Sequence, residues 1–126
     1  MSIASYSAGF NAIRTAHNPA SRALLDACDR IGMLVLNEAF DVWSQGKSEN
    51  DYSLVFAEDW QTDLREMIVA ARNHPSVIMY STGNESIELA SPAGAHLARL
   101  LASLRSRPRP DALRDECPPT HVDRDR

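Results

Sequence analysis

The stretch NHPSVIMYSTGNE, residues 73–85, decides the fold class of this 126-residue chain. A helix-breaking Asn-His-Pro turn leads into an apolar run from Val77 to Thr82, which predicts a β-strand, and the run delivers the polar pair Asn84 and Glu85. In parallel β/α folds the loops that follow the carboxyl ends of the strands form an open rim where active sites gather. We therefore expect Glu85 to be a catalytic acid. The alternative is that Asn84 and Glu85 only cap the helix that follows, because both residue types suit a helix start.

Two βα units precede this stretch. Residues 10–15 predict a short strand, after which Asn18-Pro19 offers a helix N-cap followed by proline at the first helical position. Gly32 suits the end of that helix, because glycine takes the left-handed conformation at no steric cost. The continuous apolar run over residues 33–36 then predicts a parallel strand that is covered on both faces. The first helix is expected to bury Leu24, Leu25, Cys28 and Ile31.

Two more helices follow the same alternation. One is expected over residues 56–72, and another is expected to begin at Ser91-Pro92. The buried face of the former should consist of Trp60, Leu64, Met67, Ile68 and Ala71, and that of the latter of Leu97, Leu100, Leu101 and Leu104. Alternating strands and helices predict an α/β fold of about three βα units with parallel strands.

Four segments of the chain carry a family resemblance. They are GFNAIRTAHNP (residues 9–19), CDRIGMLVLNEAF (28–40), NHPSVI (73–78) and GNE (83–85). In this order and spacing they resemble the catalytic barrel of family 2 glycoside hydrolases, the group of β-galactosidases, β-glucuronidases and β-mannosidases. The resemblance implies a (β/α)8 TIM barrel, which needs roughly 250 residues. We therefore expect a partial barrel domain over residues 1–104.

The resemblance also implies roles for the residues at the strand ends. Glu85 would be the general acid and then the general base of a retaining mechanism, and Asn84 would bind the hydroxyl beside the reacting carbon. The acid must keep its proton until it is used, which burial and a neighbouring carboxylate favour. The family's nucleophile is a glutamate on a later strand, which this chain does not reach. The remaining substrate-binding residues implied by the resemblance are Arg14, His17, Asn18, Glu38 and Asp41.

No metal ion and no other cofactor is expected at this site. Some family members bind magnesium through a carboxylate and a histidine just after the second strand, but Val42 and Ser44 stand at those positions here. A third alternative is a metal-dependent hydrolase that uses His17, Glu38 and Asp41. Their spacing matches no closed metal motif.

Residues 105–126 differ in composition from the rest of the chain. They hold six of the 13 lysines and arginines, four of the seven prolines and no aromatic residue. So little apolar surface cannot offset the entropy of ordering, which predicts a disordered or out-of-family tail. A truncation or a change of reading frame near Leu104 would explain this shift, and the other reading frames of the DNA would test it.

Composition limits the remaining classes of function. A net charge of −4 and a pI near 5.5 give no basic surface for nucleic acid, and no apolar run reaches the roughly 20 residues of a membrane span. The N-terminus shows no secretion signal, from which we expect a cytoplasmic protein, and Cys28 and Cys117 are expected to be free thiols. The expected partner is a carbohydrate substrate acted on at a β-linked O-glycosidic bond. The alternative is a non-catalytic relic, or a piece that rebuilds a barrel with a complementary segment or a second copy.

Overall fold

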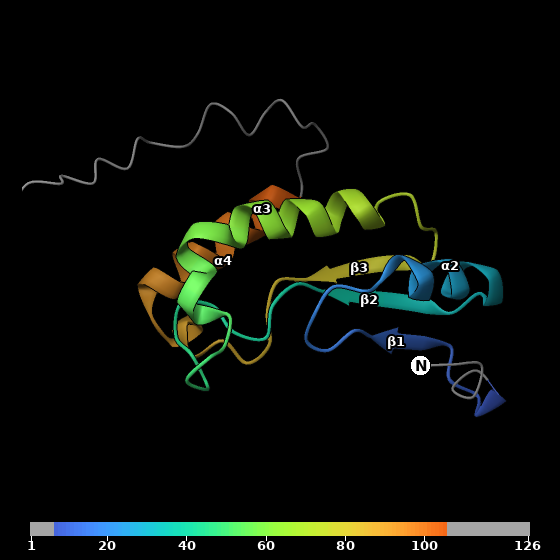
Figure 1. Ribbon diagram of the computed structural model, residues 1–126, viewed down its shortest axis with the longest axis horizontal. Coiled ribbons are helices and arrows are strands. Elements are labelled where there is room, and N and C mark those ends of the chain that lie inside the picture. The colour runs from blue at the N-terminus through green and yellow to red at the C-terminus, as the bar shows by residue number, and fades with distance from the viewer. Residues whose placement is uncertain (1–6, 106–126) are drawn as a thin grey trace, which may run out of the picture.

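The computed structural model describes residues 7–105, which form three parallel strands and the helices between and after them (Figure 1). The tail was predicted over residues 105–126, and all of it beyond residue 105, including the thiol of Cys117, lies outside this range. The sheet has the order β1-β2-β3. The elements in chain order are β1 (Ala12–Arg14), α2 (Arg22–Ile31), β2 (Leu34–Glu38), α3 (Ser53–Ala71), β3 (Val77–Ser81), the 3₁₀ helix η1 (Ile87–Ala90) and α4 (Pro92–Arg105).

The strand register brings the carboxyl ends of all three strands to one edge of the sheet. Arg14 pairs with Leu36, and Glu38 pairs with Ser81. The ladder between β2 and β3 shifts at Val35/Leu36, so β3 is offset in its second half. Because parallel strands end at the same edge, the segments after Arg14, Glu38 and Ser81 form a common rim.

The prediction that Asn18-Pro19 starts the first helix was wrong. The Asn18 N–H donates to the Thr15 carbonyl (3.0 Å), which makes a turn, and Ser21 caps α2 instead by accepting the Leu24 N–H (3.3 Å). The predicted end is confirmed, since Gly32 has φ 72°. A serine cap satisfies an N–H group that the first helical turn leaves free.

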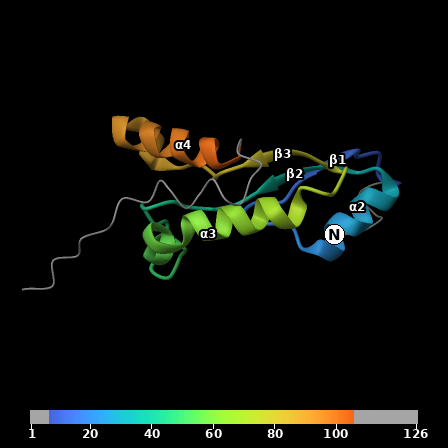
Figure 2. The same ribbon diagram turned by 90° about the horizontal axis from the view of Figure 1, so that it is seen from above.

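Two apolar clusters hold the described residues together. One joins α2 to the sheet and includes Leu25, Cys28 and Val35, and the other joins α3 to α4. Figure 2 shows α4 running beside α3. The predicted face of α3 is confirmed, with Leu64, Met67 and Ala71 buried and Trp60 and Ile68 packed against the cluster. Cys28 is buried as a free thiol.

One face of the sheet is uncovered, contrary to the prediction for β2. Leu34 is 38% exposed, and Met79 on β3, which pairs with Leu36 of β2, is 52% exposed. Helices α2 and α3 cover the opposite face, where Val35 is fully buried. The uncovered face is the one that a parallel sheet normally buries.

Helix α4 begins at Pro92, as predicted, and packs less deeply than expected. Leu101 is fully buried, but Leu100 is 42% exposed because it lies one residue off the stripe that faces α3. Gly94 lies against the Glu88 carbonyl, where any side chain would overlap it. Within residues 7–105, no helix is long and apolar enough to cross a membrane.

Candidate functional site

Glu38 is the centre of the polar rim at the carboxyl end of the sheet. Its carboxylate is fully buried and accepts hydrogen bonds from Arg14 Nε (2.8 Å) and Arg14 Nη2 (2.9 Å), while His17 Nδ1 lies 3.0 Å from Oε1. Burial raises the pKa of Glu38, but the hydrogen bonds from Arg14 and His17 outweigh it and hold that pKa below its usual value. Glu38 is therefore a buried carboxylate whose hydrogen bonds orient the partly exposed side chains of Arg14 and His17.

Asn84 is joined to the same network through its side chain. Its Oδ1 accepts from Arg14 Nη2 (2.8 Å), and its Nδ2 donates to Asp41 Oδ1 (3.2 Å). Arg14 thus bridges β2 and the loop after β3 with one guanidinium group. Five of the predicted site residues, Arg14, His17, Glu38, Asp41 and Asn84, lie in one connected cluster.

Lys47 reaches into this cluster from the loop after β2, and the sequence analysis did not single it out. Its ammonium group donates to Asp41 Oδ1 (2.9 Å), to the Asp41 carbonyl (3.2 Å) and to the Asn84 carbonyl (3.1 Å). Lys47 and then Asn84 lower the pKa of Asp41. A signal was available, because Lys47 is the only lysine in the sequence.

Glu85 follows Asn84 and is exposed, which contradicts the expectation that burial protects its proton. Its backbone is left-handed, with φ 47°, a conformation that costs a residue with a side chain about 1–2 kcal/mol. The pKa of Arg14 is raised by its hydrogen bond to Glu38 and, to a smaller extent, by the charge of Glu85. Glu85 is therefore close enough to Arg14 for their charges to interact. Ser86, not Asn84 or Glu85, is the N-cap of η1, so the capping alternative is not supported.

Two further contacts join the loops after β2 and β3, and both were missed in the sequence. The buried Glu88 accepts hydrogen bonds from Ser44 Oγ (3.0 Å) and the Gln45 N–H (2.7 Å). The Trp43 indole donates to the Thr82 carbonyl (2.8 Å) and lies so close to Gly83 that a Cβ there would be 2.5 Å from Nε1. Glu88 stands alone as an acid among the apolar residues 87–90, which was a usable signal.

Asn18 is the predicted site residue that stays apart. It lines a cavity of about 610 Å³ together with Asp41, beside Tyr52, Asp63 and Met67 of the helix layer. Arg14, His17, Glu38, Asn84 and Glu85 do not line this cavity. The cavity therefore adjoins the rim cluster at Asp41, and the other four members of that cluster lie outside its lining.

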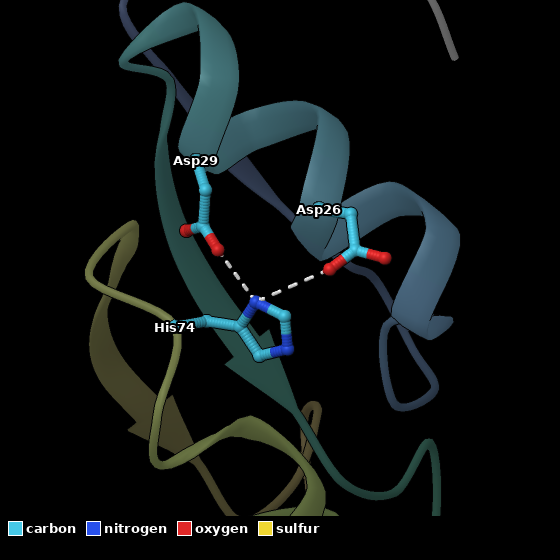
Figure 3. Close-up of side chains that lie close together, drawn as sticks. All are labelled: Asp26, Asp29 and His74. Atoms are coloured by element: carbon cyan, nitrogen blue, oxygen red, sulfur yellow. Dashed lines mark hydrogen bonds and ion pairs between the residues drawn. The ribbon is translucent and has the colours of Figure 1, made fainter.

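A second histidine–carboxylate cluster lies at the opposite end of the sheet, before β3 (Figure 3). His74 Nδ1 lies 2.6 Å from Asp29 Oδ2 and 3.9 Å from Asp26 Oδ1, and Asp29 Oδ1 accepts the Ser76 N–H (3.0 Å). Ser76 and then His74 lower the pKa of Asp29. These contacts tie α2 to the turn before β3.

The metal-hydrolase alternative fails on geometry. Within residues 7–105, a single group of three potential ligand residues brings its ligand atoms within 4.8 Å of one another, and that group is Asp26, Asp29 and His74. His17 and Glu38 touch, but Asp41 is engaged by Lys47 and Asn84. Both oxygens of Asp29 already accept hydrogen bonds within the protein, so we interpret the Asp26–Asp29–His74 cluster as structural.

Comparison with known proteins decides the family. The sequence profile described as "Glycosyl hydrolases family 2, TIM barrel domain" matches residues 5–111. This chain belongs to glycosyl hydrolase family 2. The three parallel strands with their helices are accordingly part of a family 2 TIM barrel, as the resemblance of the four segments predicted.

The similar proteins are family 2 glycosidases. Over 87 residues the chain is 49% identical to β-galactosidase BoGH2A of Bacteroides ovatus, covering 69% of this chain and 10% of that protein. It is 32% identical to the β-glucuronidase of Felis catus over 98 residues, covering 78% of this chain and 15% of the relative. The crystal structure of a family 2 member from Bacteroides cellulosilyticus superposes with a TM-score of 0.78 at 48% identity, covering 80% of this chain and 13% of that one. The chain thus spans a small part of the length of its relatives.

Proposed function

We propose that this chain supplies the acid/base half of a retaining β-glycosidase site, with Glu85 as the proton shuttle. Cleavage of a glycosidic bond places negative charge on the departing oxygen, and Glu85 would donate a proton there. The carboxylate formed would then take a proton from the water that releases the sugar. Asn84 and Arg14 would bind sugar hydroxyls beside the reacting carbon.

The observation that carries this proposal is the rim cluster around Glu38. Five polar side chains from two strands and three loops converge beside Glu85, and each is held by at least one charge-assisted hydrogen bond. Such preorganised donors stabilise developing charge without reorganisation during the reaction. Residues that only stabilised the fold would not need to present partly exposed Arg14 and His17 at an open edge.

The nucleophile has to come from outside this chain. A retaining mechanism needs a second carboxyl group about 5 Å from the acid. Glu38 at the end of β2 and Asp41 just after it share the rim with Glu85, and both are committed to ion pairs. We infer that the remaining barrel strands, in a longer protein or a partner chain, provide it.

A second candidate is a non-catalytic piece that needs a complementary segment. The exposed Leu34 and Met79 on the uncovered sheet face favour it, because an uncovered parallel sheet invites association or aggregation. The two candidates are separated by whether a complete barrel that contains this segment hydrolyses 4-nitrophenyl β-galactoside or 4-nitrophenyl β-glucuronide.

The acid/base role can be tested in a chimera. The matched 87 residues of β-galactosidase BoGH2A are replaced by the corresponding residues of this chain, which returns the grafted segment to a complete barrel. Glu85→Gln in the graft should lower turnover of 4-nitrophenyl β-galactoside roughly 10²–10⁴-fold. Azide should restore turnover, because it attacks the glycosyl intermediate without needing a general base.

The control for this test is Glu49→Gln, which removes one exposed negative charge from the rim loop. Its turnover should equal that of the unmodified chimera. An active chimera that tolerates Glu85→Gln would refute the acid/base role, and a folded chimera without activity would favour the non-catalytic candidate.

A further inference from the structure

The ammonium group of Lys47 has all three of its N–H donors engaged by the rim. Two go to Asp41, through its side chain and its carbonyl, and the third goes to the Asn84 carbonyl at 3.1 Å. A surface lysine with three protein acceptors is restricted to one position, since each N–H direction is occupied. Lys47 therefore joins the loop after β2 to the loop after β3.

The carbonyl that Lys47 holds belongs to the peptide bond that precedes Glu85. This peptide plane and the Glu85 Cα define φ of Glu85, which is 47°. A left-handed conformation at a residue with a side chain persists only where its surroundings fix it. The side chain of Asn84 is held by Arg14 and Asp41, but the backbone carbonyl is held by Lys47.

Lys47 is itself presented by a closed turn. Asp51 Oδ2 accepts the backbone N–H groups of Lys47 (2.5 Å) and Ser48 (2.8 Å), and Asp51 Oδ1 accepts from Ser53 at the start of α3 (3.0 Å). Ser53 first, followed by the Ser48 N–H, lowers the pKa of Asp51 to about 2, so this clamp stays ionised at neutral pH. A continuous series of contacts thus leads from the start of α3 to the backbone of Glu85.

We propose that Lys47 is a positioning residue for Glu85. It fixes the peptide plane before Glu85, stabilises the left-handed turn, and so aims the carboxyl group into the space beside Arg14. The catalytic consequence rests on the proposed function of Glu85, whereas the structural statement about the turn does not. Lys47 touches no reacting atom and acts only through Asn84 and Asp41.

The turn can be tested by nuclear magnetic resonance on the full 126-residue chain. The three-bond coupling between the amide proton and the carbonyl carbon of the same residue is larger at a small positive φ than in helical or extended backbone, so it reports the Glu85 conformation directly. In Lys47→Met this coupling should move toward a conformational average, while Gly32, the left-handed residue at the far end of the sheet, keeps its value. Lys47→Arg should restore most of the wild-type value, because a guanidinium also donates to both carbonyls.

The matched control is again Glu49→Gln, which changes the charge of the same loop without touching the Asn84 carbonyl. An unchanged Glu85 coupling in Lys47→Met would overturn the proposal, as would an equal change in Glu49→Gln. If Lys47→Met does not fold, Asp51→Asn serves as a second variant. It loosens the turn that presents Lys47, and it should shift the Glu85 coupling in the same direction by a smaller amount.

The catalytic consequence is measured in the chimera. Lys47→Met should lower kcat roughly 10–100-fold with little change in KM, because a misplaced acid slows the chemical step more than it weakens binding. Lys47→Arg should recover most of kcat. An inactive chimera with Lys47 intact would refute the proposed function and leave the coupling result standing, whereas an active chimera indifferent to Lys47→Met would refute the positioning role.

Discussion

His17 with Glu38 at the rim and His74 with Asp29 at the opposite end of the sheet are built from the same groups and do different work. In both pairs the histidine Nδ1 contacts a carboxylate oxygen, at 3.0 Å and 2.6 Å. At the end of the sheet opposite the rim, Asp29 is contacted by His74 and by the Ser76 N–H, and both of these residues belong to the turn before β3. At the rim, the buried Glu38 holds two side chains that remain partly exposed.

The difference lies in which partner is buried. His74 is mostly buried, with 12% of its side chain exposed, whereas His17 is 38% exposed and Arg14 is 44% exposed. A buried base that meets a carboxylate ties two elements together. At the rim, the buried Glu38 instead orients the partly exposed Arg14 and His17, which can donate hydrogen bonds to a ligand. We therefore expect substitutions at the rim to affect activity and substitutions at the His74–Asp29 pair to affect stability.

Of the substitutions that test this comparison of the two pairs, Glu38→Gln should have the largest effect, because it breaks the pair at the rim. Arg14 and His17 lose the anion that orients them, and turnover of the chimera should fall about 100-fold. The free energy of unfolding should fall by about 1–3 kcal/mol, less than for a fully buried pair because Arg14 is partly solvated. Aryl-glycoside turnover and urea unfolding measure the two effects. Unchanged turnover in a folded variant would contradict the role assigned to the rim.

A smaller effect, on stability alone, is expected from His74→Ala. Loss of the hydrogen bond to Asp29 should lower the free energy of unfolding by about 1–3 kcal/mol, because Asp29 loses one of its two partners. Turnover per folded molecule in the chimera should stay the same. A loss of turnover larger than the loss of folded protein would show that the two ends of the sheet are not separate in function.

The smallest effect is the pH dependence of stability that Asp51 contributes through its hydrogen bonds to the turn that presents Lys47. The pKa of Asp51 is lowered to about 2 in the folded protein, whereas in the unfolded chain it is near 4. The ionised carboxylate therefore stabilises the fold above pH 4, and this stabilisation is lost as the pH falls toward 2. The stability difference between the wild type and Asp51→Asn should therefore be constant above pH 5 and shrink below pH 4. Urea unfolding at several pH values measures it. A difference that does not vary with pH would mean that the Asp51 charge is not coupled to folding.

The sequence predicted the order of strands and helices, because strand runs and helical stripes are local patterns. It also located the strand ends, where Arg14, Glu38 and Asn84 meet. It missed the start of α2, since Asn18-Pro19 and Ser21 are both acceptable starts and only the tight turn at Thr15 decides between them. The exposure of Leu34 also escaped prediction, because an apolar run is the same whether or not its second face is covered.

The loops were the least predictable part of the site. Lys47 and Glu88 act across 37 and 44 positions of sequence, on Asn84 and Ser44 respectively, and no local pattern encodes such a pairing. The expected burial of Glu85 failed for a related reason. Burial depends on what covers a residue, and within residues 7–105 no segment covers Glu85.

The contact between Trp43 and the Thr82 carbonyl gives the molecule an internal optical signal. The chain has two tryptophans, Trp43 in the loop after β2 and Trp60 on α3, so Trp60→Phe leaves Trp43 as the sole tryptophan emitter. An indole that is buried and hydrogen-bonded emits at shorter wavelength than one in water. The colour of its fluorescence would therefore reveal, in real time and without a label, whether the loops on either side of Glu85 are together or apart.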